Sequence, residues 1–401
     1  MLRGRHSVPR LGIALLVSLV VLGACGGGGG NKNKASEGGS TNGKKTAVLG
    51  FVGALTGDSA NLGVNIRDGA KVAIDEWNKK GGPITYQLKE FDTQGAAEQA
   101  QGQKDKFLPD SSILGIVGPG FSGETKAVLP DLEQAGLVMV SASATNAALP
   151  TIVPNSKVFH RIIADDDVQA QGVSNYVIKV IKPKKVALIN DNTEYGKGLW
   201  EGVTKLLTAA KIDTSTTDSV DPKSQDFSAT VNKVKAAKVD MVFYGGYYSE
   251  AGRLKKQLTD AGVKAKFISG DGSLDQGFIT SSGAAGGEGA LLTCPCRLAT
   301  PDLPGKAGEF AKNYKTLNGR EPGTYSSEGY DSASILIAGI EAGNDTRAKL
   351  LNYVDTLTSF DGVSKTIEFA PNGNIKAGDV FVYEVKSGKL SELGRTSELA
   401  K

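Results

Sequence analysis

The sequence predicts an α/β protein whose chain folds into two lobes with a ligand cleft between them. Its 401 residues are enough for about two domains, and 40% of them are hydrophobic, which suffices for two cores. Strand-like apolar runs alternate with amphipathic helical segments, which is typical of parallel sheets covered by helices. The alternation restarts at Lys182-Pro-Lys-Lys185, so we place the start of a second unit near residue 165. A cleft between two such units is the usual place for a small ligand.

The first unit is predicted from the spacing of its apolar residues. Continuous apolar runs bounded by glycine and proline indicate buried strands, and apolar residues three and four apart indicate helices. In order, the predicted elements are strand 46–52, helix 62–79, strand 84–91, helix 96–108, strand 113–117, helix 123–134 and strand 137–141.

The second unit shows the same periodicities. Its predicted elements are strand 186–190, helix 195–210, strand 241–244, helix 249–261 and strand 267–269. Near the C-terminus, 366–369 and 380–385 are strand-like and flank Pro371-Asn-Gly-Asn374. We predict a β-hairpin-like end there, because Asn and Gly favour turns.

Charge and composition exclude several classes of function. The 46 basic and 43 acidic residues give a net charge of +3, without the basic excess of a nucleic-acid-binding protein. Three cysteines are too few for a disulfide framework or a four-thiolate zinc site. Only two histidines are present, which restricts imidazole chemistry.

The first 25 residues have the pattern of a secretion signal. Three arginines precede the apolar stretch 11–22, which at 12 residues is too short to span a bilayer as a mature helix. It ends in Leu22-Gly23-Ala24-Cys25, which resembles a bacterial lipobox, where the cysteine is lipidated and becomes the first mature residue. The alternative is a plain signal peptide with a coincidental cysteine. Removal of 1–24 would leave 43 basic and 43 acidic residues and one histidine, His160.

The segment from Cys25 to residue 45 is predicted to be a lipidated cysteine followed by a flexible tether. Residues 26–45 contain many glycines and no apolar residue larger than alanine, so they cannot form a core. A lipid anchor and a tether would hold the body near a membrane without spanning it.

A glycine-rich turn precedes the predicted helix 123–134. Gly118-Pro-Gly120-Phe-Ser-Gly123 matches G-x-G-x-x-G, but it is not in the first strand-to-helix turn and the next strand ends without an acid. Both facts argue against a dinucleotide site. Backbone N–H groups at this helix start, with Ser122, would still attract an anion such as a carboxylate. The alternative is an ordinary capped helix with Ser122 as the cap.

Three more loops follow predicted strands and carry polar or aromatic residues. Such loops lie at the carboxyl edge of a parallel sheet, where open α/β folds bind ligands. The first, 141–146, offers small and hydroxyl side chains; the second, 244–248, pairs two glycines with tyrosines. In the third, Asp271 stands between glycines and would hold an ammonium group, unless it only forms a turn.

Other polar features have simpler interpretations. The run Asp165-Asp-Asp167 lacks the spacing of a calcium loop, so a solvated linker or helix cap is preferred to a metal site. His160 has no evident nucleophile partner, which favours packing or charge pairing. Cys294-Pro-Cys296 would form a small local disulfide in an exported protein, although residues two apart lie near the upper distance limit for one.

Residues 46–398 resemble the type I periplasmic substrate-binding proteins of branched-chain amino-acid ABC transporters. The motifs that carry the resemblance are Ala144-Thr145-Asn146, Asp191-x3-Tyr195-Gly196-x-Gly198, Tyr244-Gly-Gly-Tyr-Tyr248-x-Glu250 and Gly329-Tyr330-Asp331-Ser332-Ala333. The resemblance implies two Rossmann-like lobes joined by three crossovers. It places the N-terminal lobe at 46–165 plus 295–375 and the C-terminal lobe at 166–294 plus 376–401. Cys294 and Cys296 would then lie on a hinge crossover.

The resemblance also implies a set of ligand-binding residues. Ser122 and Thr145 would hold the ligand's α-carboxylate together with backbone N–H groups nearby, including that of Ala144. Asp271 and the Ser143 carbonyl would hold its ammonium group. Tyr195 and Tyr247 would close over the ligand, and Leu62 would touch its side chain. Asp271 is shorter than the glutamate common in the family, and an aromatic of some members is replaced at Leu62 or Ser327.

The resulting expectation is a lipid-anchored, extracytoplasmic solute-binding protein that delivers an amino acid, branched-chain or related, to an ABC transporter permease. We expect no enzymatic activity, no cofactor, no metal and no nucleic acid, and we expect a monomer. One alternative is a ligand-sensing module for a membrane receptor. Another is a binding protein for an amide, urea or aromatic acid.

Overall fold

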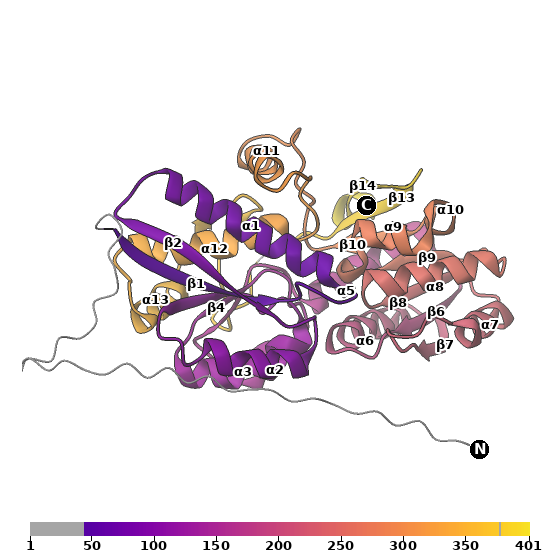
Figure 1. Ribbon diagram of the computed structural model, residues 1–401. Helices are drawn as coiled ribbons and strands as arrows, with labels where there is room; N and C mark the ends of the chain where they lie inside the picture. The colour runs from indigo at the N-terminus through magenta and orange to yellow at the C-terminus, as the bar shows by residue number, and fades with distance from the viewer. Residues whose placement is uncertain (1–43, 377) are drawn as a thin grey trace, which may run out of the picture. The chain divides into compact units, whose positions relative to one another are not determined.

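The computed structural model describes residues 44–376 and 378–401. The predicted signal peptide, Cys25 and nearly all of the tether lie outside the described residues. Two parallel-stranded sheets organise the rest (Figure 1), and we name the lobe built on each sheet the first and the second lobe.

The first lobe is built on a five-stranded, all-parallel sheet in the order β2-β1-β3-β4-β5. Strand β1 is apolar and buried from Ala47 onward, because β2 and β3 flank it and helices cover both faces of the sheet. Helices α1 and α12 lie on one face, and α2 and α3 on the other (Figure 1). The strands are β1 (Lys45–Gly53), β2 (Ile84–Asp92), β3 (Ile113–Val117), β4 (Met139–Ser141) and β5 (Phe159–Arg161).

Seven helices belong to the first lobe, three of them from the later part of the chain. Helix α12 packs along α1 and against β3 and β4, while α13 packs on β3 and α11 on α1. The helices are α1 (Ala60–Lys79), α2 (Ala97–Phe107), α3 (Ser122–Ala135), α4 (Leu149–Ile152), α11 (Lys306–Asn318), α12 (Ser326–Glu341) and α13 (Arg347–Asp355). A two-stranded ribbon, β11 (Phe360–Asp361) with β12 (Thr366–Ile367), follows α13.

The second lobe is built on a seven-stranded sheet in the order β14-β13-β10-β9-β8-β6-β7. Its strands from β10 to β7 run parallel, and β13 and β14 extend it antiparallel. The strands are β6 (Lys185–Asn190), β7 (Asp213–Ser219), β8 (Met241–Gly245), β9 (Lys266–Ser269), β10 (Leu291–Cys294), β13 (Phe381–Lys386) and β14 (Lys389–Arg395). The helices are α5 (Asp166–Tyr176), continued by a π-helical turn (Val177–Ile181), then α6 (Glu194–Ala209), α7 (Ser228–Ala237), α8 (Tyr248–Asp260), α9 (Gln276–Ser282), α10 (Ala284–Gly287) and α14 (Thr396–Leu399).

The chain passes between the two sheets three times: from β5 to α5, from β10 to α11, and from β12 to β13. Cys294 ends β10, and its disulfide to Cys296 lies at the start of the second passage. The two-lobe α/β fold predicted from the alternating pattern is therefore confirmed.

The expected hairpin between 366–369 and 380–385 is wrong. Residues of β12 pair with β11, and β13 pairs with β10 and β14, turning into β14 through Ser387 and Gly388. The Pro371–Asn374 turn closes only one isolated bridge, Phe369 to Ile375. A turn does form at Pro371–Asn374, but β13 pairs with the edge strand β10 of the second sheet instead of with β12.

No helix of the described residues is both long enough and apolar enough to cross a membrane.

Candidate functional site

Loops from both lobes meet at the carboxyl ends of their parallel strands and enclose a small cavity. Because all strands of each parallel sheet point the same way, the loops after β3, β4, β6, β8 and β9 gather at that edge. The lining residues are Leu62, Gly120, Phe121, Ser122, Ser143, Tyr195, Tyr247, Asp271, Gly272 and Tyr325. The cavity volume is about 10 Å³, barely what one water molecule needs. A ligand larger than water therefore enters only when the surrounding loops separate.

The start of α3 presents uncharged hydrogen-bond donors to this cavity. Ser122 is the first helical residue, not the cap, and its Oγ accepts the Asn146 backbone N–H at 3.1 Å. The Ser122 hydroxyl hydrogen thus remains available to a ligand. The preceding Gly118 has φ +109°, and a Cβ there would lie 2.2 Å from the Val52 carbonyl oxygen, so only glycine fits this turn.

Glu124 lies beneath this helix start and completes its cap. Its Oε2 accepts the Phe121 N–H at 3.0 Å, and its other oxygen accepts the Thr93 hydroxyl. Burial raises the pKa of Glu124 to about 7, against the lowering effect of these hydrogen bonds. Glu124 is therefore about half protonated at neutral pH and brings less negative charge to the helix start than an exposed glutamate would.

The loop after β4 is held from behind by a buried arginine. Arg161 is fully buried and donates to the carbonyl oxygens of Ala144 (3.0 Å) and Asn146 (2.8 Å). The Ser143 hydroxyl donates to the Gly120 carbonyl, which ties this loop to the start of α3. Between them, the buried hydroxyl oxygen of Thr145 has no hydrogen-bond partner among the described residues.

Aromatic rings of both lobes meet over the cavity. Phe121 and Tyr247 stand directly before α3 and α8, and their ring centroids lie 5.1 Å apart. Tyr195, from α6, contacts Tyr247 at the same centroid distance. As Glu124 does for Phe121, Glu250 accepts the Tyr247 N–H, at 2.9 Å. The two helix starts thus share one local construction, and they place their aromatic residues against each other.

Asp271 is the one charged residue that lines the cavity, and it is fully buried. Its Oδ1 accepts the Tyr195 hydroxyl at 2.7 Å and the Gln169 side-chain amide at 2.8 Å, and its Oδ2 accepts the Tyr325 hydroxyl at 2.6 Å. Burial raises the pKa of Asp271, and these three donors oppose that rise. All three are uncharged, so the carboxylate still lacks a positive partner.

Of the eight ligand-binding residues expected from the sequence, Leu62, Ser122, Ser143, Tyr195, Tyr247 and Asp271 line the cavity. Ala144 and Thr145 do not; they are buried directly behind it, and the Ala144 N–H donates to Ser141. Ser327 does not line it either, whereas the nearby Tyr325 does. Sequence reasoning missed Tyr325, Gln169 and Arg161, because their roles arise from tertiary contacts that no local motif announces.

The other polar features of the sequence are structural. Asp165 caps α5 by accepting the Val168 N–H at 3.1 Å, as one alternative expected. Its neighbour Asp166 is buried instead of solvated, and both its carboxylate oxygens lack hydrogen-bond partners among the described residues. His160 is buried against the Phe369 ring at 4.7 Å, where burial lowers its pKa to about 4. No cluster of three or more potential metal-binding side chains occurs in 44–376 or 378–401.

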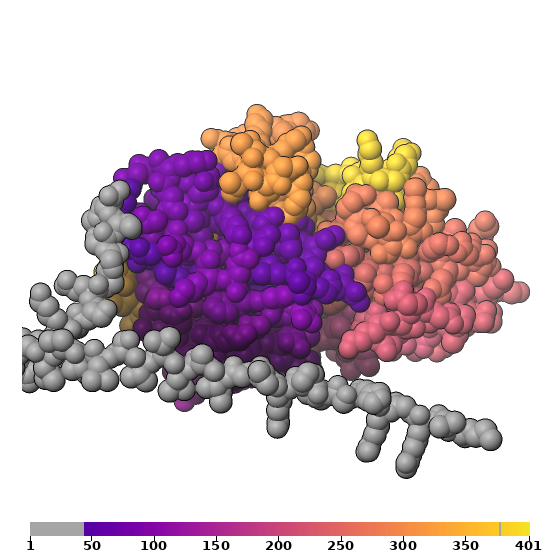
Figure 2. Space-filling model, viewed as in Figure 1, coloured from indigo at the N-terminus to yellow at the C-terminus, as the bar shows by residue number. Residues whose placement is uncertain are grey.

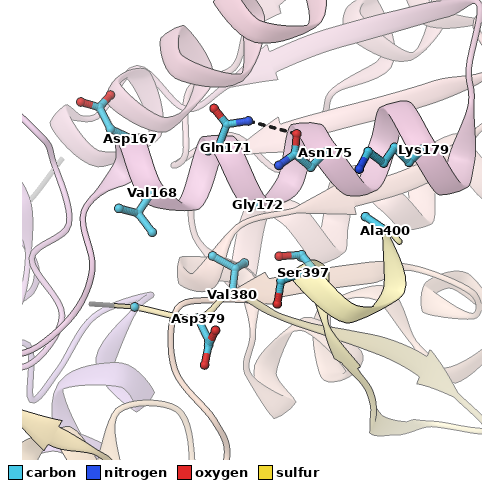
Figure 3. Close-up of a pocket in the computed structure, with 12 residues that line it drawn as sticks. Asp167, Val168, Gln171, Gly172, Asn175, Lys179, Asp379, Val380, Ser397 and Ala400 are labelled. Atoms are coloured by element: carbon cyan, nitrogen blue, oxygen red, sulfur yellow. Dashed lines mark hydrogen bonds between the residues drawn. The ribbon is translucent and has the colours of Figure 1, made fainter. Parts of the chain in front are cut away.

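A larger hollow, of about 610 Å³, lies elsewhere, between α5 and the C-terminal segment (Figure 3). Asp167, Gln171, Asn175 and Lys179 line it from the helix. Gln171 and Asn175 bond each other, and none of the expected ligand-binding residues contributes. The smaller cavity is therefore the better candidate site, since its lining converges from both lobes.

Several hydrogen bonds hold the two lobes together around the site. Asn146 Nδ2 donates to the Glu194 carbonyl at 2.6 Å, and Asn61 Nδ2 donates to Asp275 at 2.7 Å. At the surface, Lys126 pairs with Glu194. On the face shown in Figure 2, atoms of the first lobe (indigo) and of the second (salmon) adjoin. The structure is thus a closed arrangement.

Comparisons with known proteins agree with this fold. A family model described as "Periplasmic binding protein" matches residues 46–389. The Leu/Ile/Val-binding protein BraC3 of Rhizobium johnstonii is 30% identical over 348 residues, covering 86% of this chain and 92% of the relative.

Two solved structures share the fold at lower identity. The branched-chain amino acid substrate-binding protein LivJ of Streptococcus pneumoniae, in complex with isoleucine, has a TM-score of 0.80 at 24% identity, covering 87% of this chain and all of that one. A solute-binding protein of R. palustris, in complex with benzoate, has a TM-score of 0.78 at 18% identity, covering 88% and 96%. With a family model that spans most of its length, this chain belongs to the periplasmic binding protein family.

Proposed function

We propose that this protein captures an α-amino acid with an apolar side chain between its lobes, outside the cytoplasm, and delivers it to an ABC transporter permease. The observation that carries the proposal is Asp271, a buried carboxylate on the cavity wall with three uncharged donors and no positive partner. A buried carboxylate is best stabilised by a cation, and an ammonium group supplies one.

The opposite wall suits the carboxylate of the same ligand. The Ser122 hydroxyl and the start of α3 lie on the first-lobe side of the cavity. A helix N-terminus favours an anion without a lysine or arginine, and no basic side chain lines the cavity. A zwitterion with adjacent charges would satisfy both walls at once, with the Ser143 carbonyl as a second acceptor for the ammonium group.

The remaining lining residues favour an apolar ligand side chain. Leu62, Phe121, Tyr247 and Tyr325 contribute aliphatic and aromatic surface. The Leu/Ile/Val-binding relative points to the same ligand class. Benzoate, which the R. palustris neighbour holds, has no ammonium group and would leave Asp271 buried without a cation.

Capture requires the lobes to move as units. We propose that the N-terminal lobe comprises 46–165 plus 295–375 and the C-terminal lobe 166–294 plus 376–401, with closure driven by ligand contacts to both. We further propose that the protein acts as a monomer and has no enzymatic role, since both lobes contribute residues to the cavity and its lining suits binding.

We also propose that the body is tethered to the outer face of the cell membrane. The support is the lipobox-like Leu22-Gly23-Ala24-Cys25 and the glycine-rich segment that follows.

A thermal-shift screen tests the ligand class. Probes that share one carbon skeleton separate the two charges: L-isoleucine, 3-methylpentanoate without the amine, and 2-methylbutylamine without the carboxylate. We expect only L-isoleucine, or another apolar amino acid such as L-leucine, to raise the unfolding temperature, because only a zwitterion satisfies both walls. An equal rise with 3-methylpentanoate or benzoate would contradict the proposal.

A further inference from the structure

Tyr325 belongs to the first lobe, and its side chain reaches Asp271 of the second lobe. It directly precedes α12, which packs on α1, β3 and β4 of the first lobe. Its hydroxyl donates to Asp271 Oδ2 at 2.6 Å, and Asp271 follows β9 of the second lobe. This bond therefore exists only when the lobes are together.

The two oxygens of Asp271 are served from different lobes. Oδ1 accepts from Gln169 and Tyr195, which stand on α5 and α6 of the second lobe and move with Asp271. Gln169 also accepts the Asp271 backbone N–H at 3.0 Å, which fixes the residue within its own lobe. Among the described residues, only Tyr325 donates to Oδ2.

The backbone at Tyr325 is held in an unfavourable conformation. Its φ of +67° lies in the left-handed region, which a bulky residue rarely adopts and which costs of the order of what one hydrogen bond provides. The preceding Thr324 donates its hydroxyl to the Leu274 carbonyl, also in the second lobe. Two consecutive residues of the first lobe, Thr324 and Tyr325, thus donate to two residues of the second lobe, Leu274 and Asp271.

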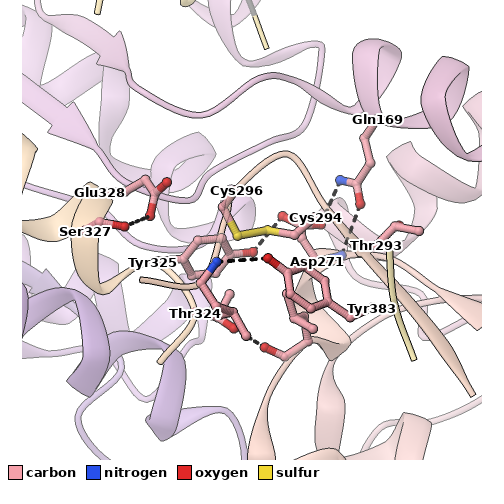
Figure 4. The surroundings of a disulfide bond; sticks show 12 residues. Gln169, Asp271, Thr293, Cys294, Cys296, Thr324, Tyr325, Ser327, Glu328 and Tyr383 are labelled. Carbon is pink, nitrogen blue, oxygen red and sulfur yellow. Dashed lines mark hydrogen bonds between the residues drawn. A yellow bond between two sulfur atoms is a disulfide. The ribbon is translucent and has the colours of Figure 1, made fainter. Parts of the chain in front are cut away.

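The hinge disulfide lies beside this contact. Figure 4 shows the Cys294–Cys296 bond next to Tyr325 and Asp271, with Gln169 on the far side of the carboxylate. Both cysteines are buried. The contact is therefore close to where the chain leaves β10 for the first lobe.

We propose that Tyr325 is a positioning residue that latches the lobes closed through Asp271, the same carboxylate that would receive the ligand's ammonium group. Formation of the bond orients Oδ2 and stabilises the closed state before any ligand is bound. A ligand that needs the closed state then binds more tightly, because less of its binding free energy goes into closure. The ligand part rests on the proposed function; the latch itself does not.

The test compares Tyr325→Phe with Tyr330→Phe. Tyr330 stands on α12, the helix that Tyr325 precedes, and its hydroxyl donates to Glu76 inside the first lobe, so its removal controls for the loss of a tyrosine hydroxyl. We expect small-angle X-ray scattering without ligand to give a larger radius of gyration for Tyr325→Phe than for the wild type, with Tyr330→Phe unchanged. Calorimetry with L-isoleucine should show roughly 10- to 100-fold weaker binding for Tyr325→Phe only.

Each outcome decides the proposal. A radius of gyration for ligand-free Tyr325→Phe equal to that of the wild type would overturn the latch, as would tighter binding of L-isoleucine. If the wild type fails to bind L-isoleucine, the proposed function is at fault, and the ligand-free scattering comparison still decides the latch. Thermal unfolding of both variants shows that each is folded.

Discussion

Glu124 shows how a single residue couples the site to pH. Its carboxyl, buried under the start of α3, has its pKa raised to about 7, against 4.5 for an exposed glutamate. Between these values the folded protein binds a proton that the unfolded chain releases. The stability that this group contributes is therefore fully present below about pH 4.5 and is lost as pH rises through about 7.

The Glu124→Gln variant removes this titration while keeping an acceptor for the Phe121 N–H. We expect the free energy of unfolding of the wild type, relative to the variant, to fall by roughly 3 kcal/mol between pH 4.5 and 7.5. Urea unfolding of both proteins at a series of pH values measures this difference in free energy of unfolding. The contributions of the other buried acids are the same in both proteins and therefore cancel. A difference that is flat with pH would show that Glu124 titrates normally.

At the residue level, the sequence indicates which side chains follow strands at the cavity, but it does not indicate side chains that reach the cavity from other elements. Asp271 and Ser122 were found because strand-end loops of parallel sheets converge on ligands. Tyr325 precedes α12, a helix that is not among those predicted from the sequence. Its left-handed backbone conformation could not be predicted either, since glycine is the residue that usually adopts it. Gln169 looks like any polar residue of a surface helix until α5 is placed beside Asp271.

At the scale of elements, α6 meets both its own lobe and the opposite one through two glycines. A Cβ on Gly196 would lie 2.1 Å from Asp191 Oδ1 and 2.6 Å from the Gly245 carbonyl oxygen, both in the second lobe. A Cβ on Gly198 would lie 2.6 Å from Asn146 Nδ2, in the first lobe, and 2.9 Å from Asp166 Oδ2. Gly196 thus allows close packing within the second lobe, whereas Gly198 leaves room for Asn146 of the first lobe as well as for Asp166 of its own lobe.

The matched pair Gly196→Ala and Gly198→Ala tests this division. We expect Gly196→Ala to lower the free energy of unfolding, because backbone must shift. Gly198→Ala should displace Asn146 and weaken L-isoleucine binding about tenfold by calorimetry, the range of a lost hydrogen bond, with little change in stability since alanine favours helix. Equal destabilisation by both variants would show that Gly198 is packed within one lobe.

The same scale explains which elements were predictable. Strands such as β3, and helices such as α6, were found within a few residues because their apolar periodicity is local. The hairpin at 366–385 was misplaced because strand pairing depends on which sheet edge is free, and β13 completes the edge at β10. Short strands such as β5, three residues long, carry too little pattern to be recognised.

At the scale of the whole molecule, the two lobes form one site, and each lobe contributes polar groups of a different kind to it. Between the lobes the cavity presents uncharged donors on one wall and a single carboxylate on the other. The sequence predicted this two-lobe division from alternation and from a restart of the pattern. It could not predict that the lobes are bonded directly through Tyr325 and Asp271, or Asn146 and Glu194, since such contacts depend on how far the lobes close.

Calorimetry on the Asp271→Asn variant decides whether Asp271 binds the ammonium group of the ligand. Asparagine keeps the size of the side chain and one of the two acceptor oxygens that Tyr195 and Tyr325 use, but it removes the charge. The control is Asp331→Asn, another buried acid, which accepts the backbone N–H groups of Val363 and Ser364 away from the cavity. With the amino acid that binds the wild type, the account predicts affinity at least ~100-fold weaker for Asp271→Asn and unchanged for Asp331→Asn. An Asp271→Asn protein that is folded and binds the amino acid as tightly as the wild type would contradict it.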